Sequence, residues 1–451
     1  MIRLLRLDAL QLIRDRLAVG VLAAELVACL IAVMIGVAWQ NHLTSERESV
    51  RDKVESDQIY EREKWAGAAH GNPIDSVNIP SLYMITFQLA PPLLADFTVG
   101  RSAIEPAAAS VRLSTRPDGM FARYQVENPE RLARGTLDLT FVALVIAPLL
   151  LISLGYGVFT SDRESGTARL WLAQAGTPLR LIVMRSINRW ALVFVPILLA
   201  GFTLWFVGPA ERGGAILEWL GIVALVLCFW WSLILLINSF RISAETAALA
   251  LVGLWTLLVF VAPVAIGSAA VLINPPPSHF EEIAATRAAE IAATRSYEDD
   301  HPELSSSTLE GRRAATQKGI EVRRTIARVI APLQAETERQ FVAQRHFGQR
   351  LSLLSPSLLA SDTLASIAHT DSAAYATQRE AAVRYFDTLA EALASVALGE
   401  RPVDTEAFDA LPRFEPPSPP QPPLFPILWI AIVTIVIISI ALLRLRRMKP
   451  F

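Results

Sequence analysis

The sequence GAILEWLGIVALVLCFWWSLILLINS occupies residues 214–239 and contains a single charged side chain, Glu218. A helix rises about 1.5 Å per residue, so about 20 apolar residues cross the roughly 30 Å hydrocarbon core of a bilayer. An apolar run of this length predicts a membrane-spanning helix.

The same pattern recurs along the chain. We expect six spans, at residues 17–38, 137–160, 190–208, 214–239, 244–273 and 425–443. The fifth is longer than a bilayer requires and contains Pro263 and Gly267, so we expect it to tilt, bend or project beyond the membrane. Of the 451 residues, 53% are hydrophobic and 19% are charged, whereas an average soluble domain is about 25% charged. This composition argues against a soluble enzyme, a disordered regulator and a nucleic-acid binder.

The chain starts with basic residues followed by the apolar run 17–38, as a secretory signal peptide does. This run is longer than the apolar part of a typical signal peptide, and no clear cleavage site follows it. We therefore interpret residues 17–38 as a retained membrane anchor.

Lysine and arginine near the span ends predict the orientation, because cytoplasmic loops of membrane proteins are enriched in both. Segments 1–16, 161–189, 240–243 and 444–451 together hold 14 Lys or Arg residues against 4 Asp or Glu residues. The other segments outside the spans hold 27 against 35. We therefore expect both termini in the cytoplasm, with residues 1–16 as an amphipathic helix and residues 444–451 as a short tail.

Two long loops then lie outside the cytoplasm, at residues 40–136 and 274–424, and each is long enough to form a small domain or half of a joint one. The only cysteines, Cys29 and Cys228, lie in apolar runs, so these loops must fold without disulfides. The predicted fold class is therefore an all-α polytopic membrane protein with six transmembrane helices and a largely helical extracytoplasmic domain formed by the two loops.

Local composition predicts the elements of these loops. Residues 274–411 are expected to be a helical domain, because residues 278–350 are rich in Ala, Glu, Arg and Gln, and their first part should continue the fifth span outward. Within this domain, helices are expected at 309–350 and at 373–398, the latter capped near Asp371. Short strands are allowed between residues 73 and 135.

The proline-rich residues 412–424 are expected to form an extended linker that leads back to the sixth span, since proline fixes φ and removes a hydrogen-bond donor. A plain spacer is the favoured interpretation. A docking site for a partner in the cell envelope is the alternative.

No catalytic or nucleotide-binding motif is present. The chain lacks the phosphate loop G-x-x-x-x-G-K-[ST], and it also lacks HExxH, CxxC and GxSxG. It therefore cannot hydrolyse ATP through a phosphate loop of its own. His279 and His301 have acidic neighbours, but we interpret both as solvated polar surface, and we expect no catalytic site, no metal site and no bound cofactor.

Glu25 is the one acidic or basic side chain near the middle of a predicted span. An intramembrane carboxylate is costly, so such a residue is a functional candidate. A structural role, as a protonated group bonded to a neighbouring helix, is favoured. A polar site on a translocation path is the alternative.

The segment SDRESGTARLWLAQAGTPLRLIVMRSINR, residues 161–189, directly follows the second span. Gly166 and Gly176 can interrupt a helix, and Thr167 and Pro178 can start one. The pattern thus predicts a short helix between two hinges at the membrane surface. Such an element can transmit force from a cytosolic partner to two spans, but an ordinary interfacial turn remains open as an interpretation.

The motif DRESGT at residues 162–167, followed by a helix and by GTP at residues 176–178, resembles the E-R-E-x-G-T cytoplasmic signature of ABC-2 type transporter permeases. Aspartate here replaces the first glutamate. The six spans, the cytoplasmic termini and the amphipathic N-terminal segment also match. Residues 353–386 are similar to a segment of a bacterial subfamily with large extracytoplasmic domains.

The resemblance implies a permease subunit of an exporter in the bacterial inner membrane. Its partners would be the lipid bilayer, a separate ABC ATPase subunit that binds ATP, and a second permease half, either a second copy or a related chain. No nucleic acid is implied. The ATPase-coupling positions would be Asp162, Arg163, Glu164, Gly166 and Thr167.

Two other functions compete with this one. A membrane-anchored cell-envelope scaffold or assembly protein would use the outer loops and the proline-rich linker to hold partners, without transport. An intramembrane enzyme would need at least two polar catalytic groups at one depth, and Glu25 alone does not supply them.

Overall fold

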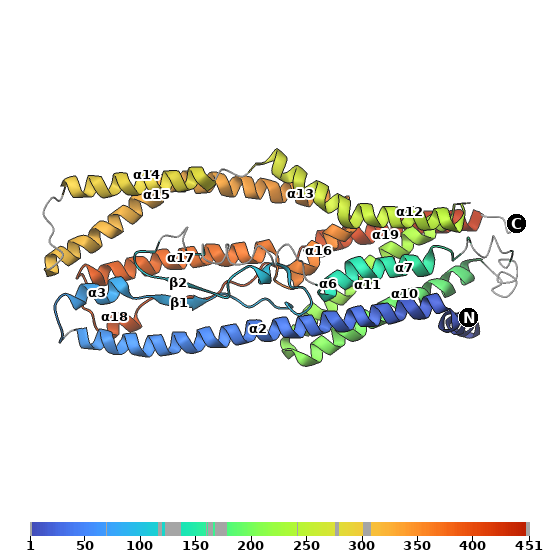
Figure 1. Ribbon diagram of the computed structural model, residues 1–451, viewed down its shortest axis with the longest axis horizontal. Helices are drawn as coiled ribbons and strands as arrows, with labels where there is room; N and C mark the ends of the chain where they lie inside the picture. The colour runs from blue at the N-terminus through green and yellow to red at the C-terminus, as the bar shows by residue number, and fades with distance from the viewer. Residues whose placement is uncertain are drawn as a thin grey trace.

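The computed structural model describes residues 2–68, 70–115, 120–121, 137–158, 160, 166, 178–240, 242–275, 279–300 and 308–447. The described chain is elongated and mostly helical, and both termini lie at the same end of the long axis (Figure 1). We call this the terminal end. The opposite half, called the distal domain, comprises residues 40–68, 75–88, 108–111, 279–300, 309–352, 372–397 and 405–409.

Within the described residues, five helices are long and apolar enough to cross a membrane. They are the first part of α2 (Arg16–Ala68), Ile182–Val207 of α10 (Pro178–Val207), α11 (Gly213–Asn238), the continuous stretch Ala244–Ile273, and Leu424–Leu445 of α19 (Leu424–Arg447). The remaining predicted span corresponds to a shorter apolar helix, Leu139–Gly155, which covers about 25 Å at ~1.5 Å per residue. The count of six spans therefore stays a prediction.

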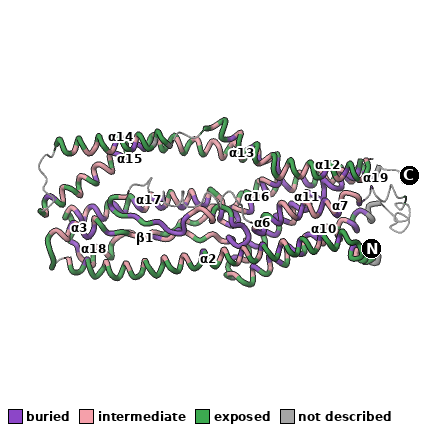
Figure 2. The backbone as a smooth tube through the Cα atoms, viewed as in Figure 1, coloured by how far each residue is buried: buried purple, intermediate pink, exposed green. Residues whose placement is uncertain are grey.

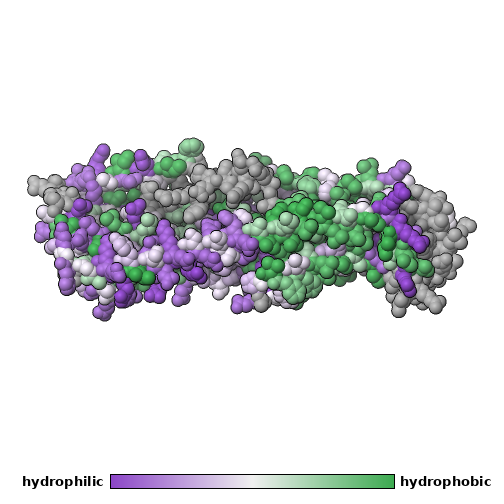
Figure 3. Space-filling model, turned by 60° about the horizontal axis from the view of Figure 1, so that its bottom comes forward, coloured by the Kyte–Doolittle hydropathy of each residue, from purple (hydrophilic) through white to green (hydrophobic). Residues whose placement is uncertain are grey.

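The apolar helices form a bundle around α11. In α11, 67% of the most apolar window is buried, against 6% in Ala244–Ile273. Figure 2 shows the buried residues concentrated on α11, α7 and α16, and Figure 3 shows a hydrophobic band over this part of the molecule, with hydrophilic surface beyond it. This band is the surface that a bilayer would cover.

Two of the apolar stretches contain a π-helical turn. Leu139–Gly155 consists of α6 (Leu139–Phe141), the π turn η3 (Val142–Ile146) and α7 (Ala147–Gly155). Ala244–Ile273 consists of α12 (Ala244–Thr256), the π turn η5 (Leu257–Val261) and α13 (Ala262–Ile273). Each π turn ends two residues before a proline, Pro148 or Pro263. Because proline cannot donate to the carbonyl four residues earlier, a wider turn is accommodated there.

Helix α2 continues far beyond the predicted first span. Its 53 residues measure roughly 80 Å at ~1.5 Å per residue, so one helix runs from the terminal end into the distal domain (Figure 1). The residues after position 39 are charged but contain no proline before Pro73. At its far end, Trp65 is fully buried against Tyr83 and Phe408, with ring centroids 6.3 and 5.4 Å away.

The fifth span does not continue outward as expected. Helix α13 ends at Ile273, where Asn274 leaves the helical conformation with φ −125° and ψ 73°. A separate helix α14 (His279–Asp300) follows and packs against α15 (Leu309–Ser352). The prediction of helices on both sides is confirmed, but the predicted continuity is wrong, because the helix is interrupted at Asn274 and Pro275.

The rest of the distal domain packs on α17 (Ser372–Ala397). Helix α3 (Asp75–Leu82) contacts α17, and β1 (Ile85–Gln88) pairs antiparallel with β2 (Ala108–Val111), with Ile85 opposite Val111. The expected helices at 309–350 and 373–398 are confirmed, as is the cap, since Asp371 accepts a hydrogen bond from the backbone N of Ala374. Short strands within 73–135 are confirmed too.

The described chain has four further elements besides α16. They are α1 (Ile2–Arg14), the 3-10 turns η1 (Gly100–Ala103) and η4 (Ala210–Arg212), and α18 (Thr405–Asp409). Helix α16 (Pro356–Ile367) links the two halves, because it packs on α11 and α19 and is followed directly by α17. The proline-rich linker runs along the distal domain, where Phe414 lies 4.6 Å from Phe87 between ring centroids.

Candidate functional site

Most of the predicted coupling positions lie outside the described residues. Asp162, Arg163, Glu164 and Thr167 are among them, so the coupling role stays a prediction. Gly166 is described. Its φ is +75°, and a Cβ added there would meet no atom of the described residues within 4 Å. A positive φ is the conformation that glycine adopts without strain, so the backbone conformation at this position favours glycine.

The flanks of the coupling segment are well defined. Helix α7 ends at Gly155 and helix α10 begins at Pro178. Arg185 Nη1 donates to the carbonyl oxygen of Val158 at 2.5 Å, and Arg189 Nε donates to that of Leu154 at 3.2 Å. Carbonyls at the end of a helix lack partners within the helix and carry its partial negative charge. Two arginines of α10 thus join the end of α7 to the start of α10.

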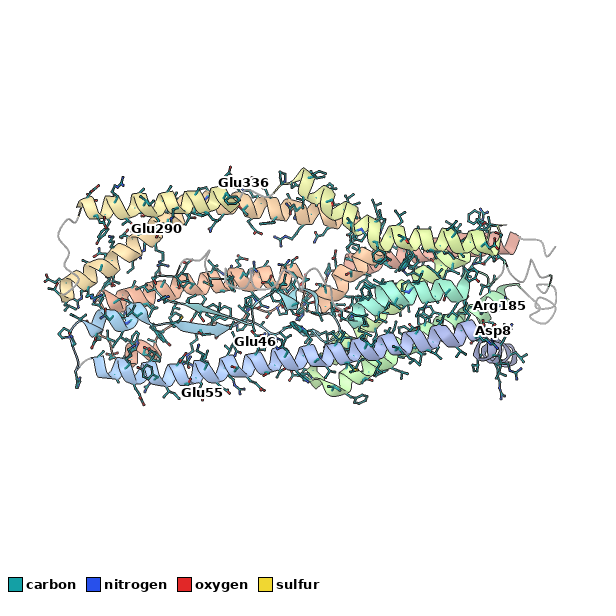
Figure 4. The ribbon with its side chains drawn as sticks, in the orientation of Figure 1. Asp8, Glu46, Glu55, Arg185, Glu290 and Glu336 are labelled. Atoms are coloured by element: carbon teal, nitrogen blue, oxygen red, sulfur yellow. The ribbon has the colours of Figure 1, made fainter. Side chains whose placement is uncertain are left out.

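The same arginines hold the N-terminal helix through Asp8. Asn188 Nδ2 donates to Asp8 Oδ2 at 2.8 Å, Arg189 Nη1 lies 3.4 Å from Asp8 Oδ2, and Arg185 Nε lies 3.9 Å from Asp8 Oδ1. The exposed fractions of Asp8 and Arg185 are 2% and 4%. Figure 4 shows these two residues together at the terminal end. We call Asp8, Arg185, Asn188 and Arg189 the Asp8 cluster.

The electrostatics of this cluster favour a fixed arrangement. One carboxylate faces two guanidinium groups in a site with little water, and removing one partner of a buried pair leaves an uncompensated charge at a cost of about 3–5 kcal/mol. Both guanidinium groups also donate to carbonyl oxygens at or just after the end of α7, those of Leu154 and Val158. The cluster therefore holds α1, the end of α7 and the start of α10 together. The last two elements lie directly before and after the segment between positions 158 and 178.

Sequence reasoning missed this cluster. Arg185 and Arg189 were used only as markers of membrane orientation, and Asp8 was not singled out. A signal was available, because an aspartate in a short basic and apolar helix is unusual, and Arg185 and Arg189 lie one helical turn apart just before an apolar run. The sequence pattern could not predict that α1 packs against α10.

Glu25 lies inside the bundle. Its side chain is 0% exposed, and neither carboxylate oxygen has a hydrogen-bond partner among the described residues. It shares the buried face of α2 with Cys29, Ala32 and Gly36, and α2 packs there against α10 and α7. The Asp8 cluster and Glu25 are thus separate sites.

A second polar junction lies at the other end of the bundle. Arg212 Nη1 donates to Asp96 Oδ1 at 2.8 Å, and its Nη2 donates to the carbonyl oxygen of Leu204 at 2.7 Å. Nearby, Asp138 caps the start of α6 and accepts from the backbone N of Val99. The segment between β1 and β2 is thereby attached to the ends of α10, α11 and α6.

The described residues give no support for a metal centre. No three His, Cys, Asp or Glu side chains gather in the part of the chain that the structure describes. Position 301 lies outside that part.

A family model described as ABC-2 family transporter protein matches residues 2–449, nearly the whole chain. No curated protein and no solved structure gives a significant match.

Proposed function

Because the chain belongs to the ABC-2 family of transporter proteins, and is thus a transmembrane ABC transporter permease, we propose that it couples ATP hydrolysis by a separate ATPase subunit to export across the bacterial inner membrane. The proposal assigns the coupling role to residues 161–177 and places both termini in the cytoplasm. A second permease half, identical or related, completes the path.

The observation that carries the proposal is the Asp8 cluster. A permease that has no ATPase domain must be driven by conformational changes of a subunit outside the membrane. The segment that contacts this subunit must therefore be attached firmly to helices that cross the membrane. Arg185 and Arg189 attach the segment after α7 to α10, and Asp8 adds α1 to the same point. A displacement of residues 161–177 would therefore move three helices together.

The arrangement of the termini supports the orientation. The N-terminus, the C-terminus, the end of α7 and the start of α10 all lie at the terminal end (Figure 1). This end also carries the arginine-rich segments, which are retained in the cytoplasm in most membrane proteins.

The stretch Ala244–Ile273 is weakly buried and presents an apolar surface on which a second permease half could pack. Its side chains Leu249, Leu257 and Val264 are 76%, 50% and 69% exposed. Lipid or another apolar helix can cover such a surface.

The first test is purification of the tagged full-length chain from native membranes. The proposal predicts that an ATPase with a phosphate loop copurifies and that the complex hydrolyses ATP. A preparation that holds no such subunit and has no ATPase activity would contradict it and favour a scaffold.

The second test concerns the coupling positions. Glu164→Ala and Gly166→Leu should uncouple ATP hydrolysis from transport without loss of the complex, the second because a side chain is strained at φ +75°. Gly319→Leu is the control, since Gly319 has open space around it and an ordinary φ. Normal coupling in both coupling variants would rule out the assignment.

A further inference from the structure

The start of helix α16 contacts the π turn η5 of the stretch Ala244–Ile273. Ser355 Oγ donates to the carbonyl oxygen of Leu258 in η5 at 2.8 Å. The same hydroxyl accepts from the backbone N of Leu358 at 3.3 Å, which caps α16. The side chain of Ser355 is 0% exposed. One buried hydroxyl thus starts α16 and at the same time reaches an apolar helix about 100 residues earlier in the chain.

The carbonyl oxygen of Leu258 is the group that the wide turn leaves open. In an α-helix this oxygen would accept from the backbone N of Ala262, but that N–H donates to Leu257 instead. In a π turn it would accept from residue 263, which is proline and has no N–H. A backbone carbonyl away from water needs a hydrogen-bond partner. Ser355 provides that partner from outside the helix.

Helix α16 is itself held at both ends. Before its start, the carbonyl oxygen of Leu353 accepts from Trp429 Nε1 of α19 at 3.1 Å. After its end, the carbonyl oxygen of Ala368 accepts from the backbone N of Leu93 and of Leu94, at 2.9 and 3.2 Å. Helix α17 of the distal domain follows four residues later. The hydroxyl that reaches η5 is therefore carried by a helix whose position depends on the distal domain.

Both π turns lie against α16, at the place where the bundle meets the distal domain (Figure 1). Trp255 Nε1, at the end of α12, donates to the carbonyl oxygen of Val145 in η3 at 3.2 Å, so the two turns are also joined to each other. Each turn precedes a proline, Pro148 or Pro263. Prolines and π turns are the usual points at which a helix bends. Helix α16 thus contacts both of these points.

We propose that the hydrogen bond from Ser355 to Leu258 is a conformational link through which the distal domain controls the bend of Ala244–Ile273. While the hydroxyl supplies the carbonyl, the wide turn at η5 is satisfied and the bend is held. A movement of the distal domain that withdraws Ser355 leaves this carbonyl without a donor, so the turn must rearrange. The proposal needs no ATPase and stands independently of the coupling role of residues 161–177.

Thermal unfolding of the full-length protein in detergent tests the bond. Ser355→Ala should lower the melting temperature by about 2–4 °C, because it leaves a carbonyl unsatisfied and removes a cap. Pro263→Ala restores an N–H at residue 263, so the helix can supply Leu258 by itself. In that background Ser355→Ala should have a clearly smaller effect, since only the cap is lost. Equal losses in both backgrounds would show that Ser355 acts as a cap alone and would overturn the proposal.

Two variants control this comparison. Ser355→Thr keeps both the donor and the cap, so its melting temperature should stay close to that of the wild type. Ser243→Ala removes the cap of α12, where Ser243 accepts from the backbone N of Thr246 at 3.2 Å. Its effect should be the same with proline or alanine at position 263. A dependence on position 263 in Ser243→Ala as strong as in Ser355→Ala would count against the assigned bond.

The bend itself is measured by the distance between two spin labels, at Leu249→Cys and Leu272→Cys, in a background without the native cysteines. These side chains are 76% and 81% exposed and lie on opposite sides of η5. Ser355→Ala should shift or broaden the distance distribution, and Ser355→Thr should preserve it. Loss of a cap on α16 alone would not move this distance. An unchanged distribution in Ser355→Ala would show that the bond does not control the bend and would overturn the proposal.

Discussion

Arg212 Nη1 lies 2.8 Å from Asp96 Oδ1, with the two side chains only 2% and 4% exposed. The pair joins the hairpin between α10 and α11 to the segment that leads from β1 into the bundle. Together with the Asp8 cluster at the opposite end of the bundle, it means that buried charged groups hold both ends of α10.

Asp96→Ala should destabilise the protein by about 3 kcal/mol or more, because it leaves the buried guanidinium of Arg212 without its counter-charge. Glu380→Ala is the control, since it breaks an exposed pair with Arg384 on α17 and should cost less than ~1 kcal/mol. Unfolding of both purified variants in detergent measures the difference. Equal stability of the two variants would show that the buried pair of Asp96 and Arg212 contributes no more to the free energy of unfolding than an exposed pair does.

Gly36 marks the closest approach of α2 to the same segment. A Cβ at this position would lie 2.2 Å from the carbonyl oxygen of Asp96, whereas a Cβ at Gly20, on the same helix, would meet nothing within 4 Å. Gly36→Ala should therefore lower the melting temperature, because α2 must move away from backbone. Gly20→Ala should leave it unchanged or raise it, since alanine favours a helix over glycine by about 0.5–1 kcal/mol. The same result for both variants would contradict the packing described.

Glu25→Gln tests the state of the intramembrane carboxylate. An ionised carboxylate without partners is very costly to bury, so replacing it with a neutral side chain of the same shape should leave the melting temperature unchanged or raise it. Glu25→Lys should lower it. A marked loss of stability in Glu25→Gln would show that the carboxylate has a charged partner in the folded protein. Unchanged stability with lost transport would instead favour a site on the translocation path.

Asp8→Asn tests the Asp8 cluster as a link between the helices. The amide keeps the shape of the side chain but removes the charge that offsets Arg185 and Arg189, so α1 should be held less firmly. In a purified complex with the ATPase subunit, we expect lower coupling between ATP hydrolysis and transport. Glu55→Gln, at an exposed position of the distal part of α2 (Figure 4), should have no effect. Full coupling of ATP hydrolysis to transport in Asp8→Asn would show that the Asp8 cluster is not needed for that coupling.

The apolar runs predicted the bundle well, because length and composition alone determine which helices can cross a bilayer. The same criterion could not detect the continuation of α2 to Ala68, since that part is charged and is stabilised by contacts at Trp65 with Tyr83 and Phe408. The end of the fifth span at residue 273 was predicted, but the break between α13 and α14 was missed, for the opposite reason. Helix propensity on both sides was high, and the interruption at Asn274 was given too little weight.

The polar contacts between distant segments were beyond prediction. Asp8 and Arg189 are far apart in sequence, as are Asp96 and Arg212, and no local pattern indicates which arginine meets which carboxylate. Glu25 was recognised because a lone carboxylate in an apolar run is conspicuous by itself. The cap at Asp371 was also recognisable, since capping depends on residues within one turn.

The central claim is that residues 161–177 face the cytoplasm and receive the ATPase. The most direct test is labelling of Glu164→Cys with a membrane-impermeant maleimide, in intact cells and in inverted membrane vesicles. The native cysteines, Cys29 and Cys228, are buried and half-buried in the bundle, so the wild type serves as the unlabelled control. The account predicts labelling only in inverted vesicles, with protection when the ATPase subunit is bound. Labelling only in intact cells would contradict both the orientation and the coupling role.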